Sequence, residues 1–389
     1  IYYILYIILR FVVINLFAHS VQLENETIVE LSSTSIDEST AEQSRLQHKL
    51  PDRPKTMRAN RPVRQQQSSW FSLWSSGKRE FSLTGLLESM VEILKYIEYL
   101  AFRYPHLVEL ITIGHSFEGQ PLKVVKVSSG PGDDLRPKPA IWIDAGMHAR
   151  EWISTAVATY ILSQLVEKNT TYSKLLDTAD WMILPIANPD GYEFSHTGDR
   201  LWRKTRSNHW LWARCDGVDP NRNFGYHWGE DKEGGMSGDP CHETYAGPSA
   251  FSEPETKAMA DINVLPLYRL YLTLHSYSQM WLVPWGHTHR RPDDYTDLAN
   301  VAKKAAKATA KVYGTSYKVG PSADLLYPTT GASDDWAKGV AGIKYSYTLE
   351  LRDRGTYGFL LPATQIIPTA RETWAGIRTM ARLVTNAGT

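Results

Sequence analysis

The sequence predicts an α/β fold: a single globular domain in which a central mixed β-sheet is flanked by helices. Three observations lead to this expectation. Apolar strand-like runs alternate with helix-like segments from about residue 82 onward. Hydrophobic residues make up 42% of the chain, which is ample for a large core. His148 and Glu151 directly follow the apolar run at 140–143, the place where open α/β sheets usually carry their functional groups.

The first 20 residues resemble a signal peptide. Residues 1–17 are apolar apart from Arg10, and the small residues Ala18 and Ser20 suit cleavage after position 20. A transmembrane anchor is the alternative, but the apolar run is short and carries a charge. We therefore expect a secreted, extracellular protein without stable membrane insertion.

Residues 21–81 are polar and lack apolar periodicity, which predicts a disordered or propeptide-like segment. Within this segment Lys78-Arg79 is a candidate processing site. Asn25 begins a glycosylation sequon, as does Asn169 in the region expected to fold, and each predicts a surface position.

The expected folded domain spans residues 82–389. Apolar residues at helical spacing between Leu86 and Ala101 predict an amphipathic helix that ends near Tyr104. The elements expected after it are strands at 108–113, 122–127 and 140–143, a helix at 153–165 and a strand at 181–186.

The C-terminal half continues the alternation after a long irregular stretch. Residues 187–250 contain little regular structure, and such a stretch in a compact domain is usually functional. Ser252 and Glu255 match a capping box that predicts a helix to about residue 262. Strands at 268–274 and 345–351 are expected, with a helix at 296–313 that stops at Gly314. A last helix, expected to start with the Thr369–Glu372 capping box, should bury Trp374, Ile377, Ala381 and Val384.

Charge and cysteine content narrow the possible partners. The 42 basic and 42 acidic residues leave no basic surplus that would indicate nucleic-acid binding. The two cysteines, Cys215 and Cys241, are expected to form one disulfide, because the leader-like N-terminus suggests an oxidising compartment. In the chain-entropy model this closure contributes about 3.5 kcal/mol. Two free buried thiols are the alternative.

His148 and Glu151 are candidate metal ligands, since a His and a carboxylate three residues apart can hold one ion from a short turn. A catalytic zinc site needs three protein ligands and one open position. The same spacing at His106 and Glu109 opens a strand and predicts a solvent-facing Glu, so the pattern alone is weak evidence. A buried core histidine is the alternative for His148. The third ligand is expected to be His275, which also ends an apolar strand.

Over some 300 residues the chain resembles zinc metallocarboxypeptidases of the pancreatic carboxypeptidase A/B group. The matching stretches are Asp144–Trp152, Arg200–Arg206, Asp219–Asn223, His275–Ser278, Tyr327 with Gly331–Trp336, and Glu350–Asp353. The resemblance implies one zinc ion per chain, held by His148, Glu151 and His275, the donor set of carboxypeptidase A. It also implies hydrolysis of the C-terminal peptide bond of a peptide or protein.

The resemblance assigns further roles around the metal. Glu350 is expected to act as general base and acid, and Arg203 to stabilise the oxyanion. An ion pair with Arg352 is the alternative for Glu350. The substrate's terminal carboxylate is expected to be bound by Asn221, Arg222 and Tyr327. Outer subsite contacts are expected from Arg200, Ser276, Tyr277 and Phe359.

Specificity is expected to depend on Asp334, which occupies the family position at the floor of the S1′ pocket. An acidic floor favours a C-terminal Lys or Arg, because an apolar side chain would leave the carboxylate unpaired at a cost of about 2–5 kcal/mol. Gly286, Ser322 and Thr348 are small enough to admit a long side chain. The alternative is that Asp334 turns aside into a hydrogen-bond network.

Together these observations predict a secreted, monomeric zinc carboxypeptidase that acts on peptide and protein C-termini ending in Lys or Arg. The alternatives are an A-type enzyme that prefers aromatic or aliphatic ends, and a catalytically silent relative that binds peptides. Zymogens of the family carry a globular propeptide domain. Residues 21–80 do not resemble one, so inhibition by a folded prodomain is not predicted.

Overall fold

A computed structural model describes residues 89–131, 137–208, 215–230, 233–263 and 267–386. These residues all belong to one structural unit, Val63–Thr389. The predicted signal peptide, the propeptide-like segment and the Asn25 sequon lie outside the described residues.

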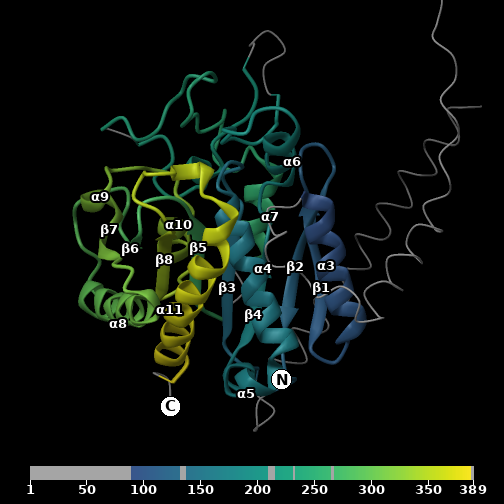
Figure 1. The fold of residues 1–389 in the computed structure, drawn as a ribbon. Helices are drawn as coiled ribbons and strands as arrows, with labels where there is room; N and C mark the ends of the chain where they lie inside the picture. Colours follow the sequence, from purple (N-terminus) through teal and green to yellow (C-terminus); the bar gives the residue numbers. More distant parts are fainter. Residues whose placement is uncertain (1–88, 132–136, 209–214, 231–232, 264–266, 387–389) are drawn as a thin grey trace, which may run out of the picture. The chain divides into compact units, whose positions relative to one another are not determined.

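A mixed β-sheet is the centre of the described part, with the strand order β1-β2-β4-β3-β5-β8-β6-β7 (Figure 1). The strands are β1 (Val108–His115), β2 (Pro121–Val127), β3 (Ala140–Ala145), β4 (Asp180–Leu184), β5 (Tyr268–His275), β6 (Met280–Val283), β7 (Lys318–Pro321) and β8 (Tyr345–Glu350). The central strands β4, β3, β5 and β8 are parallel, whereas β1 with β2, β2 with β4 and β6 with β8 are antiparallel. The expected mixed α/β sheet is therefore confirmed.

Helices cover both faces of this sheet. Successive residues of a strand point to opposite faces, so a strand that is apolar throughout contributes to a core on each side. In β3, Ile141 and Ile143 belong to one core cluster, while Trp142 belongs to another. The first cluster includes residues of α3 (Met90–Arg103), α4 (Trp152–Glu167), α5 (Asn169–Thr178), α8 (Tyr295–Tyr313) and α11 (Ile366–Asn386). The second includes residues of α7 (Pro254–Asn263) and α10 (Ser333–Gly339). Figure 1 shows α4 and α11 in front of the sheet. Within the described ranges, no helix is long and apolar enough to span a bilayer.

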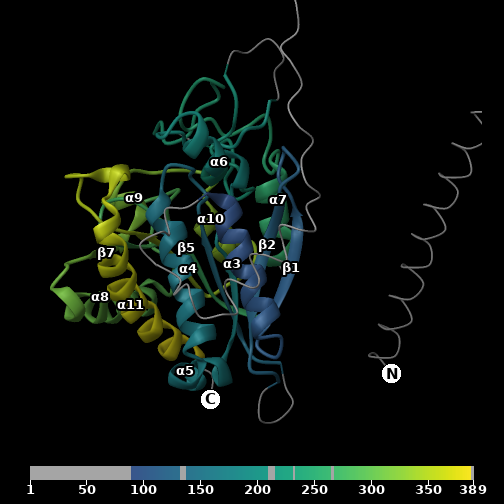
Figure 2. The same ribbon diagram turned by 45° about the vertical axis from the view of Figure 1, so that its right-hand side comes forward.

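The region from 187 to 250 contains more regular structure than predicted. It includes the helix α6 (Pro189–Thr197) and the short 3-10 helix η2 (Pro220–Arg222). Asn188 caps α6 by accepting a hydrogen bond from the Gly191 amide, and Pro189 occupies the first turn, where a missing N–H costs nothing. The segments between α6 and α7 gather at one end of the sheet (Figure 2). The structure adds elements that were not predicted: the strands β6 and β7, the helices α5, α10 and α9 (Ser322–Leu325), and the short helices η3 (Gly358–Leu360) and η4 (Ala363–Gln365).

Both predicted capping boxes are wrong, although the helices exist. The Ser252 hydroxyl donates to Glu253, and the Glu255 carboxylate accepts from the Phe117 amide, so neither side chain caps α7. Helix α11 begins at Ile366, before Thr369, so Thr369 lies inside the helix. The four residues predicted to be buried on α11, Trp374, Ile377, Ala381 and Val384, are all buried.

Candidate active site and metal centre

The three predicted metal ligands converge at the carboxyl ends of neighbouring strands. Nδ1 of His148 lies 2.8 Å from Oε1 of Glu151, and Nδ1 of His275 lies 3.0 Å from Oε2 of Glu151. The two Nδ1 atoms are 3.1 Å apart. All three side chains are buried, and in the described part of the chain this is the one group of three whose ligating atoms lie within 4.8 Å of one another.

Backbone structure positions each ligand. β3 ends at Ala145, a tight turn follows, and Glu151 precedes the first residue of α4. The turn requires Gly146, because its φ is +65° and an added Cβ would lie 2.7 Å from the Thr155 hydroxyl. His275 is the last residue of β5 and pairs in register with Glu350, the last residue of β8. The parallel sheet thus brings groups from three distant segments to one edge.

The donor set fits a divalent zinc ion. Nε2 of His148 contacts the Asp219 carboxylate at 3.0 Å, and Nε2 of His275 contacts the Thr273 hydroxyl at 3.0 Å. With both Nε2 atoms engaged, two imidazole Nδ1 atoms and one carboxylate face a common point. Such a set of acceptors suits a cation with nitrogen and oxygen ligands.

Asp219 is a further candidate functional residue, which the sequence analysis quoted within a motif without assigning it a role. It is completely buried, accepts from Nε and Nη2 of Arg203 at 2.9 and 2.7 Å, and contacts His148. Burial alone would raise the pKa of Asp219, but Arg203 and His148 hold it well below its usual range. Asp219 therefore links the oxyanion-stabilising candidate to a metal ligand.

Glu350 is not paired with Arg352, which was the alternative to a catalytic role. Arg352 instead contacts Glu372, a fully buried residue of α11. No hydrogen bond or ion pair with another described residue holds the Glu350 carboxylate. Burial, together with repulsion from Glu151, raises the pKa of Glu350 to about 8, although His275 and Arg203 partly oppose this. The carboxylate is thus available to exchange a proton near neutral pH.

A cavity of about 290 Å³ opens directly on the three ligands. It is lined by the predicted catalytic residues Arg203 and Glu350 and by the small residues Gly286, Ser322 and Thr348. The predicted substrate-binding residues that line it are Asn221, Arg222, Ser276, Tyr277, Tyr327, Asp334 and Phe359. Oδ1 of Asn221 accepts from the Ser333 amide at 2.9 Å, which fixes the orientation of this side-chain amide. Tyr327 is 51% exposed at the mouth of the cavity.

Asp334 lies in the wall of the same cavity. It is 3% exposed, and its Oδ1 accepts from the Asp335 amide at 3.0 Å. Among the described residues, its Oδ2 has no hydrogen-bond partner of good geometry, although the Thr348 side chain interacts with the carboxylate and opposes the rise of its pKa. Burial and the neighbouring Asp335 carboxylate raise the pKa of Asp334 to about 6. A buried carboxylate with an unused oxygen is suited to a cationic ligand group.

The outer residues differ in their placement. Tyr277 and Phe359 pack edge to face with ring centroids 4.9 Å apart, and both line the cavity. Arg200 is not among the lining residues. Its guanidinium lies 3.6 Å from the Trp152 ring centroid and donates to the carbonyls of Arg150 and Phe359. Arg200 therefore links the segments that contain Arg150 and Phe359 beside the cavity.

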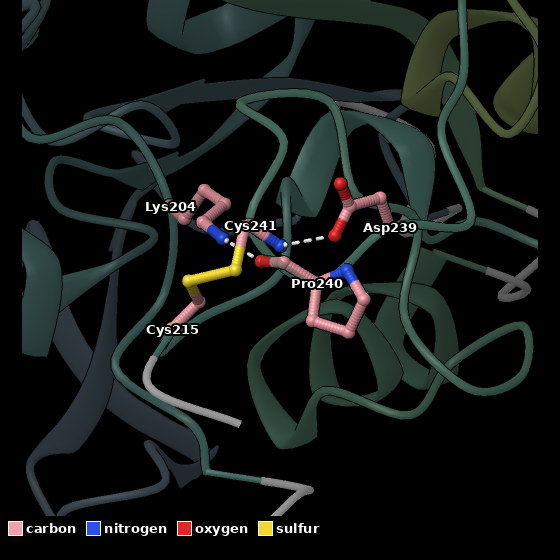
Figure 3. The surroundings of a disulfide bond; sticks show 5 residues. All are labelled: Lys204, Cys215, Asp239, Pro240 and Cys241. Atoms are coloured by element: carbon pink, nitrogen blue, oxygen red, sulfur yellow. Dashed lines mark hydrogen bonds between the residues drawn. A yellow bond between two sulfur atoms is a disulfide. The ribbon is translucent and has the colours of Figure 1, made fainter.

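A disulfide joins Cys215 to Cys241 within the irregular region (Figure 3). Beside it, Nζ of Lys204 donates to the Pro240 carbonyl at 2.7 Å, and the Cys241 amide donates to Asp239 at 2.9 Å. These contacts hold the chain next to Arg203, so the bridge supports the loop that carries one side of the site.

Comparisons with known proteins agree with this geometry. The family model described as zinc carboxypeptidase matches residues 93–376. Carboxypeptidase B of Astacus astacus is 46% identical over 295 residues, which cover 75% of this chain and 95% of that protein. Carboxypeptidase A2 of Mus musculus is 46% identical over 300 residues, covering 76% and 70% of the respective chains. The solved structure of bovine thrombin-activatable fibrinolysis inhibitor in complex with tick carboxypeptidase inhibitor superposes with a TM-score of 0.71 at 41% identity, covering 77% of this chain and 98% of that one.

Proposed function

This chain belongs to the zinc carboxypeptidase family, and we propose that it removes Lys or Arg from peptide C-termini. As a family member it is a zinc-dependent hydrolase that binds one zinc ion and acts on peptide substrates. The observation that carries the finer proposal is the buried Asp334 carboxylate in the wall of the cavity that contains the metal ligands.

In this proposal His148, Glu151 and His275 hold the zinc ion. The ion, when bound, polarises the scissile carbonyl and activates water. Glu350 accepts the proton of the attacking water and later donates it to the leaving amine. Its position beside His275 and its raised pKa support that role. Arg203 stabilises negative charge on the substrate oxygen, and Asp219 holds the guanidinium in place.

The terminal carboxylate of the substrate is bound by Asn221, Arg222 and Tyr327. Nε and Nη1 of Arg222 donate to the carbonyls of Gly235 and Asn221, which immobilises the guanidinium plane at the cavity wall. A pre-oriented guanidinium loses little entropy when it binds a carboxylate. The exposed Tyr327 has room to move onto the substrate.

In this proposal, specificity depends on the negative charge of Asp334 at the floor of the cavity. The guanidinium or ammonium group of the departing residue pairs with Asp334, and the long stem passes Gly286 and Ser322, two small residues that line the cavity. A substrate with an apolar side chain would bury against a carboxylate that lacks a partner, which costs about 2–5 kcal/mol. Tyr277 and Phe359 contact residues further from the cleaved bond.

A second candidate is an A-type preference for aromatic or aliphatic ends, which is favoured by the relatives named carboxypeptidase A2. The two candidates are separated by measuring kcat/KM on matched peptides that end in Arg and in Phe. Faster release of Phe would overturn the proposal. A silent, peptide-binding role is disfavoured, because all three ligands and Glu350 are present.

We further propose that the protein is secreted and acts as a monomer, with residues 82–389 as the catalytic domain and residues 1–20 as its leader. The leader-like N-terminal sequence and the Cys215–Cys241 disulfide support export. Expression in a secreting cell, followed by N-terminal sequencing and light scattering of the purified protein, tests these three points. Retention in the cell or a stable dimer would contradict them.

A further inference from the structure

Behind His275, on the side of the ring opposite Glu151, lie Thr273 and Asp144. Nε2 of His275 is 3.0 Å from the Thr273 hydroxyl, which in turn is 2.7 Å from Oδ1 of Asp144. The second Asp144 oxygen accepts from the Trp142 indole at 2.8 Å. We propose that Thr273 and Asp144 are positioning residues that orient His275 and determine which of its nitrogens carries the proton. This inference rests on the proposed role of His275 as a zinc ligand.

Counting hydrogens determines the direction of each bond. An ionised carboxylate only accepts hydrogen bonds, and an indole N–H only donates. The single hydrogen of Thr273 therefore goes to Asp144, and the Thr273 oxygen accepts from Nε2–H of His275. The lone pair of His275 is then on Nδ1, the atom that faces Glu151 and His148. A neutral imidazole in this tautomer is the form that binds a metal ion.

The sheet itself builds this relay. Asp144 of β3 and Thr273 of β5 are register partners, so their backbones lie side by side. Thr273 and His275 are two residues apart on one strand and therefore point to the same face. Asp144 and Thr273 are completely buried and His275 is 1% exposed, so bulk water cannot replace the hydroxyl. The relay is thus built into rigid secondary structure.

The imidazole of His148 is held by a different set of contacts. His148 contacts a carboxylate directly, and that carboxylate, Asp219, also binds Arg203. On the Nε2 side, His275 reaches the Asp144 carboxylate only through the Thr273 hydroxyl. Among the described residues, Asp144 binds no cationic side chain. Removal of the Thr273 hydroxyl should therefore affect His275 without removing a hydrogen bond of Arg203 or the contact between His148 and Asp219.

Thr273→Val removes the hydroxyl with little change in volume, and Thr273→Ser is the matched control that keeps it. We expect the zinc dissociation constant, measured by chelator competition on folded protein, to rise about 10- to 100-fold in Thr273→Val and to stay within about threefold in Thr273→Ser. In zinc-loaded protein labelled with ¹⁵N-histidine, Nε2–H of His275 should give a slowly exchanging, downfield signal. That signal should move upfield in Thr273→Val and remain in Thr273→Ser.

Asp144→Asn provides a second test. The amide has one acceptor oxygen for two approaching donors, so either Trp142 or Thr273 loses its partner. If the amide nitrogen faces Thr273, the hydroxyl must donate to Nε2 of His275, and the proton moves to Nδ1, where it blocks the metal. We expect weaker zinc binding and loss of the Nε2–H signal.

The outcomes separate this inference from the proposed function. Equal zinc affinity and equal NMR signals in Thr273→Val and Thr273→Ser would show that Thr273 only fills space, and would overturn the relay. If Thr273→Val does not fold, the wild-type spectrum decides, because a zinc-loaded protein without Nε2–H on His275 contradicts the proposed tautomer. Retention of zinc in His275→Ala would instead refute the ligand assignment itself.

Discussion

Asp334→Asn would remove the charge from the floor of the substrate cavity while preserving its shape. The Asn oxygen can still accept from the Asp335 amide, the contact that Oδ1 makes at 3.0 Å. The second position, occupied by the unpartnered Oδ2, would become an NH₂ donor. A guanidinium arriving there would meet another donor instead of an acceptor. We therefore expect kcat/KM for peptides ending in Arg to fall, and that for peptides ending in Phe to stay equal or rise.

The size of the effect follows from the burial of Asp334, which is 3% exposed. Truncating one partner of a buried charge pair costs about 2–5 kcal/mol, which is about 30-fold to a few thousandfold in kcat/KM. We expect the lower half of this range, because a cavity of about 290 Å³ leaves room for water to solvate the substrate cation.

The assay measures kcat and KM separately for two peptides that differ only in the last residue, Arg or Phe. Asp297→Asn is the matched control, because it removes the same charge from a half-exposed carboxylate on α8 that pairs with Lys344. The control should leave the Arg-to-Phe ratio of kcat/KM unchanged. An Arg-to-Phe ratio in Asp334→Asn within about threefold of wild type would refute the assignment of the pocket, given the expected loss of about 30-fold or more.

Three further predictions concern the same site and its support. The Arg-to-Phe ratio of kcat/KM should decline as the pH falls through about 6. The pKa of Asp334 is raised to about 6, and a protonated carboxyl no longer attracts a cation. A ratio that stays flat between about pH 5 and 8 would contradict this. Glu350→Gln should reduce kcat by at least about 10²- to 10⁴-fold while zinc content and peptide binding, measured by metal analysis and calorimetry, persist. Replacing Cys215 and Cys241 by Ser should lower the free energy of unfolding by about 3.5 kcal/mol in urea titrations, and an unchanged midpoint would show that the closed loop contributes nothing.

Local patterns in the chain were sufficient to predict which side chains converge as candidate metal ligands. His275 ends one apolar run, and His148 and Glu151 lie in the turn that follows another. Such runs become buried strands whose carboxyl ends share an edge of the sheet. Gly314 ends α8 in a left-handed conformation, as its place after a helical pattern predicted. These inferences work because hydrophobic periodicity and turn chemistry act over a few residues.

Capping patterns were less reliable, for a physical reason. Glu255 and Glu372 both stand three residues after a Ser or Thr, but each binds a partner from a distant segment instead. Glu372 binds Arg352, and Glu255 binds the Phe117 amide. Arg352 is cationic, and in a buried setting a charged partner outweighs a local backbone contact. The Phe117 amide is a neutral donor that the fold brings to Glu255. Competition of this kind depends on which segments pack together.

The chain alone therefore specified the candidate metal ligands and the strands that they end or follow. Tertiary structure decided which side chains support those ligands: Asp219 behind His148, Thr273 and Asp144 behind His275, and Glu372 in place of Glu350 beside Arg352. The ligands could be predicted and their supporting contacts could not, because the two depend on interactions over different separations along the chain. A strand or turn is dictated by neighbours in sequence, whereas a contact between residues as far apart as 144 and 273 exists only once sheet register places them side by side.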